Sequence, residues 1–168
     1  MDFTLKAMTP IPEEEDKPVG HMFLMYGIGL PVFSLSAMTA LQDLLEPNGT
    51  LHATESPLGP FYAFGVRRII DALDYSRSKI EYAYSLKQKK NIPREIRRYH
   101  FRLDQLGEAP IFKIPEFPLT KVFVSDLFKN RCIENQLAGF QYQQVFPPID
   151  EAQLLRDKYL RKHKEKRR

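Results

Sequence analysis

The stretch from Pro18 to Gln42 contains no Asp, Glu, Lys or Arg, so it belongs in the interior of a protein or in a membrane. A membrane-spanning helix needs about 20 predominantly apolar residues, whereas Gly27, Gly29 and Pro31 interrupt this stretch. Glycine and proline are residues that form turns. The stretch therefore predicts a buried strand, a turn and a helix, and no association with a membrane.

The composition is that of one globular domain, with 168 residues of which 43% are hydrophobic and 27% charged. Cys132 is the single cysteine, which excludes an intramolecular disulfide and fits a reducing compartment. No basic segment leads into an apolar one at the start of the chain, where the acidic run Glu13–Asp16 lies instead. We therefore expect a cytoplasmic protein.

Helical periodicity is clearest over Ala37–Glu46, where four apolar residues share one face. These residues are Ala37, Leu41, Leu44 and Leu45. We expect Ser36 to cap the start of this helix and Pro47-Asn48-Gly49 to end it.

A second helix is predicted over Leu127–Leu137, with Ser125 or Asp126 at its start. We expect Gly139 to lie at its end in a left-handed conformation. A third helix is predicted to begin at Glu151 and to continue into the basic tail.

Strands are predicted where β-branched and aromatic residues gather. The predicted strands are Phe61–Ile70, Ser78–Tyr84, Glu95–Leu103, Ile111–Ile114, Lys121–Val124 and Phe140–Val145. Within Glu95–Leu103, apolar and polar residues alternate, which predicts a half-buried strand. We expect its Tyr99–Leu103 part to share one sheet with the last three strands.

Two segments have the same layout, in which Val and Phe precede a polar cap, a helix and a glycine. The first begins at Val32-Phe33 and reaches Gly49, and the second begins at Val122-Phe123 and reaches Gly139. This layout predicts two copies of a strand, helix, strand unit. The predicted fold is a single α+β domain with a mostly antiparallel or mixed sheet, two to four helices and a basic C-terminal helix or tail.

The predicted boundaries are an N-terminal segment with the acidic loop over residues 1–29, an α+β domain over 30–148, and a helix with the basic tail over 149–168. The tail segment Arg156–Arg168 holds eight basic and two acidic residues. The rest of the chain is close to neutral. Nucleic-acid-binding domains spread Lys and Arg over one face of the fold, so binding of nucleic acid is expected only through the tail.

Catalytic chemistry finds little support in the sequence. Asp71 and Asp74 fit an acid and base pair, or a turn in which Asp74 and Ser78 bond the local backbone, and the turn is favoured. Cys132 beside a histidine fits a nucleophile, but a lone helical cysteine is more often a core residue. We therefore predict no enzyme, no catalytic residue, no metal, no cofactor and no small-molecule substrate.

Several short pieces of the chain occur in the order found in one protein family. They are Pro31-Val32-Phe33-Ser34, Tyr62-Ala63-Phe64, Asp71-Ala72-Leu73-Asp74 with Ser78 and Ile80, Ile111-Phe112-Lys113-Ile114, Val122-Phe123-Val124-Ser125 and Leu137-Ala138-Gly139-Phe140. The chain resembles immunity protein family 11 of bacterial polymorphic toxin systems. The resemblance implies a cytoplasmic protein that binds a cognate toxin and blocks it, and it carries over no catalytic residues.

Seven residues are predicted to contact the toxin. The acidic residues Glu13, Glu14, Glu15 and Asp16 would meet a basic rim, and Phe117, Tyr142 and Phe146 lie near turns or strand ends where they would be exposed. Two alternatives from other classes stay open. One is a nucleic-acid-binding protein that uses the basic tail, and the other is a small enzyme without a recognisable motif.

Overall fold

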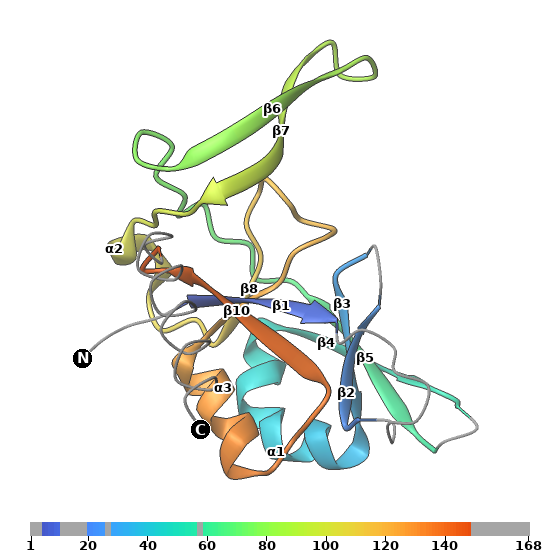
Figure 1. The fold of residues 1–168 in the computed structure, drawn as a ribbon. Coiled ribbons are helices and arrows are strands. Elements are labelled where there is room, and N and C mark those ends of the chain that lie inside the picture. Colours follow the sequence, from blue (N-terminus) through green and yellow to red (C-terminus); the bar gives the residue numbers. More distant parts are fainter. Residues whose placement is uncertain (1–4, 11–19, 26–27, 57–58, 149–168) are drawn as a thin grey trace, which may run out of the picture.

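The computed structural model describes residues 5–10, 20–25, 28–56 and 59–148 (Figure 1). Its strands are β1 (Leu5–Pro10), β2 (Met22–Met25), β3 (Leu30–Ser34), β4 (Gly49–Thr54), β5 (Phe61–Val66), β6 (Lys79–Ser85), β7 (Lys90–Arg98), β8 (Ile111–Phe112), β9 (Phe123–Ser125) and β10 (Phe140–Phe146). Its helices are α1 (Leu35–Leu45), α2 (Leu103–Leu106) and α3 (Asp126–Glu134), and a 3-10 turn η1 (Glu46–Asn48) follows α1.

The strands form two four-stranded sheets and one separate hairpin. The first sheet has the order β10-β1-β9-β8 and the second β2-β3-β5-β4, while β6 pairs only with β7 among the described strands. All the strand pairs are antiparallel. This arrangement confirms the predicted single α+β domain. Strands β1 and β2 come from the segment 1–29 and are members of the two sheets.

The two four-stranded sheets have the same strand and helix connectivity. In one, the hairpin β2-β3 leads through α1 to β4, and β5 lies between β3 and β4. In the other, the hairpin β8-β9 leads through α3 to β10, and β1 lies between β9 and β10. Both predicted strand, helix, strand units are therefore present, each with a further antiparallel strand inserted in its middle.

The first helix begins two residues earlier than predicted, so the expected cap at Ser36 is wrong. Ser34 is the capping residue, because it is extended and its hydroxyl accepts a hydrogen bond of 3.3 Å from the Ala37 amide. Ser36 lies inside the first turn of α1, where its hydroxyl is 3.0 Å from that of Ser34. The predicted buried face is confirmed, since the four apolar residues of that face are buried.

One core cluster lies between the two helices and the sheets. Helices α1 and α3 lie side by side (Figure 1), and the Arg131 guanidinium of α3 holds the Asp43 carboxylate of α1 through contacts of 2.8 and 3.2 Å. The cluster contains apolar residues from both helices and both sheets. Its fully buried members include Phe33, Leu41, Leu45, Phe64, Phe128 and Val124.

A second core cluster covers the opposite face of the first sheet. Successive residues of a strand point to opposite faces, and β8 accordingly sends Ile111 to the first cluster and Phe112 to the second. Strand β9 does the same with Val124 and Phe123. Phe123 stacks on Phe112 with ring centroids 5.6 Å apart. At β8 and β9 the first sheet is therefore buried on both faces, which explains why Ile111, Phe112, Phe123 and Val124 are all apolar.

The predicted strand Glu95–Leu103 is only partly correct. Strand β7 ends at Arg98, and Leu103 is exposed and begins α2. The residues between are extended but pair with a loop, because the Asp74 amide donates to the His100 carbonyl and the Arg102 amide donates to the Ala72 carbonyl, both at 2.8 Å. This segment therefore does not join the sheet formed by β8, β9 and β10.

The end of the second helix also differs from the prediction. Helix α3 ends at Glu134, and Gln136 takes the left-handed conformation expected of Gly139. The Leu137 amide then donates to the Cys132 carbonyl at 2.8 Å and the Gln136 amide to the Ile133 carbonyl at 3.0 Å, which closes the helix end. Gly139 lies further on, before β10, with φ of +126°.

Candidate partner-binding surface

The hairpin β6-β7 projects from the body of the protein and pairs with none of the other strands that the structure describes (Figure 1). At its base, Ile80 lies opposite Ile96, and both pack in the second core cluster. Further out, the register shifts between Glu81 and Tyr82, which leaves Arg94 without a partner in a bulge. The residues of the outer hairpin, 82–94, are all exposed or half-buried.

One face of the outer hairpin carries tyrosines. Tyr82 lies opposite Pro93 and Tyr84 opposite Asn91, and residues two apart on a strand share a face. Tyr82 is 52% exposed and Tyr84 61%, and Leu86 follows in the exposed turn. Tyrosine supplies a large apolar area with a polar end, which suits it to protein interfaces. The hairpin thus has anchor residues that the body does not use for packing.

The same segment is rich in basic residues. The segment from Lys79 to Arg98 holds seven basic and two acidic residues. The basic residues are Lys79, Lys87, Lys89, Lys90, Arg94, Arg97 and Arg98, and all of them are exposed. Arg97 forms an ion pair of 2.7 Å with Glu81, and within the described ranges the other six form no ion pair.

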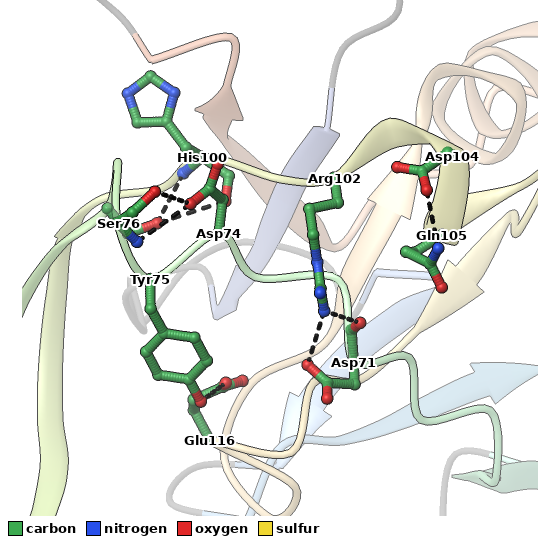
Figure 2. A network of polar contacts seen from close by, with 10 residues as sticks. Asp71, Asp74, Tyr75, Ser76, His100, Arg102, Asp104, Gln105 and Glu116 are labelled. Atoms are coloured by element: carbon green, nitrogen blue, oxygen red, sulfur yellow. Dashed lines mark hydrogen bonds and ion pairs between the residues drawn. The ribbon is translucent and has the colours of Figure 1, made fainter.

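A network of hydrogen bonds fixes the base of the hairpin (Figure 2). The Asp74 carboxylate accepts from the Ser76 amide at 3.0 Å, the Ser76 hydroxyl at 2.6 Å and the Arg77 amide at 3.3 Å. The hydrogen bond from Ser76 is the main reason why the pKa of Asp74 is lowered. The His100 amide donates to the Ser78 hydroxyl at 3.0 Å. The turn predicted at Asp74 is therefore confirmed, whereas the Ser78 hydroxyl bonds the backbone of His100 and not the local backbone.

Two further side-chain contacts strengthen the same region. Arg102 donates to the Asp71 carbonyl at 2.6 Å and pairs with its carboxylate at 3.2 Å, and the Tyr75 hydroxyl donates to Glu116 (Figure 2). Burial, followed by the bond to Glu116, raises the pKa of Tyr75 well above its usual range. Arg102 thus joins the chain after β7 to the loop before β6, and Tyr75 ties that loop to the body.

A half-buried cation lies beside Tyr99 and Phe117. The Lys121 ammonium donates to the Tyr99 hydroxyl at 3.0 Å and lies 5.0 Å from the centre of the Phe117 ring. Burial lowers the pKa of Lys121. Phe117 is consequently part of the support of the hairpin.

The seven residues predicted to bind the toxin do not form one surface in the described part of the chain. Glu13, Glu14, Glu15 and Asp16 lie outside the described residues. The exposure expected for Phe117 is wrong, because it is buried in the second core cluster. Phe146 packs against that cluster and Tyr142 against the first, each partly buried. Their contact with a toxin stays a prediction.

Sequence reasoning did not identify the hairpin as a candidate binding surface, because its charge was averaged over the whole body. Seven cations within residues 79–98 are hidden in a near-neutral total when the remaining acidic residues are counted with them. A charge count in short windows, combined with the exposed tyrosines, would have found the segment. Basic charge is therefore concentrated at a second place besides the tail.

The structure also bears on three features considered from the sequence, namely a cysteine nucleophile, a metal site and a membrane-spanning helix. Cys132 is buried in the first core cluster, and burial raises the pKa of its thiol, so the core position expected for it is confirmed. Within residues 5–10, 20–25, 28–56 and 59–148, no group of three His, Cys, Asp or Glu side chains lies close enough to hold a metal ion. No helix in these ranges is long and apolar enough to cross a membrane.

Comparison with protein families supplies the classification. A model of an immunity protein family (Imm11) matches residues 50–146, which is more than half of the chain. The chain belongs to this immunity protein family. The match includes the hairpin β6-β7 and the network at its base, and it begins after the Pro31–Ser34 segment. A search of curated proteins found no match. Membership indicates an immunity role and favours a non-enzymatic one.

Proposed function

We propose that this immunity protein binds a cognate bacterial toxin in the cytoplasm and neutralises it by direct contact. The observation that carries the proposal is a pair of exposed tyrosines, Tyr82 and Tyr84, on a projecting hairpin of a chain from an immunity family. The fold does not need these side chains for its core.

The geometry of the hairpin supports binding by contact. A specific interface buries about 800 Å² on each partner, and its energy is concentrated in a few aromatic or Arg residues. The outer hairpin offers such residues on a narrow projection. At its base, Arg102 joins the chain after β7 to Asp71 in the loop before β6, and Tyr75 bonds Glu116 of the body. A held base reduces the entropy that is lost when the hairpin binds a partner.

The first experiment tests the function itself. The chain is co-expressed with the toxin domain encoded by the adjoining gene, and growth and co-purification are measured. We expect the chain to restore growth and to purify with the toxin as a stable complex. Growth rescue without any physical association would contradict the proposal and would indicate an enzyme that reverses the damage.

A pair of double variants tests the role of the tyrosines. In Tyr82→Ala with Tyr84→Ala, two side chains that are 52% and 61% exposed are truncated. The matched control is Leu127→Ala with Ile133→Ala on α3, whose side chains are 50% and 61% exposed. We expect the hairpin variant to weaken toxin binding by about a hundredfold and the α3 variant to leave it nearly unchanged. Equal losses in both variants would exclude the hairpin as the anchor.

A further inference from the structure

The positive charge of the hairpin indicates the chemistry of the surface that it binds, which the tyrosines alone do not. Six exposed cations of one sign lie on a short segment without an ionic partner in the described part of the chain. Exposed strand edges commonly carry charged side chains, Lys especially, which prevent pairing with other chains. A cluster of one sign in addition creates a local positive field.

The positions of the cations match the rim of an interface. Lys87 and Lys89 lie in the turn beyond Tyr84, and Arg94 occupies the bulge next to Pro93, the residue opposite Tyr82. Aromatic side chains are thus flanked by cations both at the tip and along β7. Protein interfaces commonly have an apolar centre and a polar, charged rim.

We infer that the surface bound by the hairpin is an acidic surface of the toxin, which the cations attract and the tyrosines then anchor. This inference rests on the proposed function, because membership in an immunity family favours a protein partner over a nucleic acid. Charges at a rim mainly raise the association rate, and this effect weakens as salt screens it. The inference therefore concerns the rate of association more than the lifetime of the complex.

The test measures association and dissociation rates of the full chain with the toxin domain encoded by the adjoining gene. Three variants are compared with the parent: Lys87→Glu, Lys89→Glu and Arg94→Glu combined; the same three positions changed to Gln; and Lys162→Glu, Lys164→Glu and Lys166→Glu combined. The third variant changes the net charge as much as the first, but in the tail.

We expect the parent association rate to fall about tenfold between about 0.05 M and about 0.5 M NaCl. Charge reversal on the hairpin should lower the association rate at low salt at least about tenfold. The association rate of the Gln variant should lie between those of the parent and the charge-reversed variant. The tail variant should lose less than about threefold. Dissociation rates should change little in all three variants.

Three results would overturn the inference. The first is an association rate of the parent that does not depend on salt. The second is an equal loss in the hairpin and tail variants, since the effect would then follow net charge alone. The third is tighter binding of the parent to a single-stranded RNA oligonucleotide than to the toxin domain at physiological salt, lost on reversal of the hairpin charges. A parent that does not bind the toxin at all would instead contradict the proposed function.

Discussion

At Gly139 the chain before β10 touches the backbone of β2. Its φ of +126° is a conformation that other residues rarely adopt, and a Cβ there would lie 1.7 Å from the Met22 carbonyl oxygen. We expect Gly139→Ala to lower the free energy of unfolding by about 3 kcal/mol, and the larger Gly139→Val to be at least as costly. Urea unfolding measures the loss.

Gly59 provides the matched control for this prediction. Its φ is +110°, and a Cβ there would meet nothing within 4 Å. Gly59→Ala therefore carries the conformational cost alone, about 1 to 2 kcal/mol. Equal losses at the two glycines would show that the close approach to Met22 does not destabilise the variant.

Two carboxylates make the folded state sensitive to acid. Hydrogen bonds from Arg131 and Ser76 lower the pKa values of Asp43 and Asp74, respectively, below the ordinary value of 3.8. A carboxylate with a lowered pKa contributes stability above its unfolded pKa, and this contribution is lost as the pH falls through the folded pKa. We expect urea unfolding midpoints to fall between about pH 5 and about pH 2.5, and to fall less in Asp43→Asn with Asp74→Asn. If the urea midpoint fell equally with pH in the parent and the variant, Asp43 and Asp74 would not be the source of the acid sensitivity.

At the scale of the elements, the outer hairpin is separable from the core. Tyr82–Arg94 contributes no member to either core cluster, and Glu81 and Glu95 lie opposite each other where the hairpin leaves the body. Replacing Tyr82–Arg94 with Asn-Gly should close a tight turn at that point. We expect the thermal midpoint to stay within about 3 °C of the parent. A fall of ten degrees or so would show that the outer hairpin supports the fold.

Most elements were predictable where a local pattern decides them. The helical face of α1, the strands β6 and β10, and the pair β8-β9 follow periodicity and turn residues. Strand β1 was not predicted, because its place between β9 and β10 depends on partners more than 100 residues away in the sequence. The strand prediction for Glu95–Leu103 was partly wrong because pairing again depends on distant partners. Apolar and polar residues continue to alternate after Arg98, although the pairing partner there changes from strand β6 to a loop.

The site was less predictable than the fold. Phe117 was chosen because it follows a turn residue, but the rings and the Lys121 ammonium around it bury it. Exposure of an aromatic residue depends on what packs over it, and the sequence alone does not contain that information. The tyrosines of β6 are exposed because β7 is the only strand that pairs with β6 within the described ranges.

At the scale of the whole molecule, the basic tail is predicted to be independent of the domain. Lys162–Arg168 contains no apolar residue that would anchor it in a core. We expect deletion of Lys162–Arg168 to leave the thermal midpoint and toxin neutralisation nearly unchanged. Differential scanning fluorimetry and growth rescue measure the two quantities. A loss of several degrees would show that the tail packs on the domain.

The hairpin-shortened chain allows the most direct test of toxin binding through β6-β7. The dissociation constant for the toxin domain of the adjoining gene is measured for the parent and for the chain in which Asn-Gly replaces Tyr82–Arg94, both confirmed as folded by their unfolding transitions. We predict tight binding by the parent and a loss of at least about a thousandfold in the shortened chain. Undiminished binding by the folded, shortened chain would contradict the account.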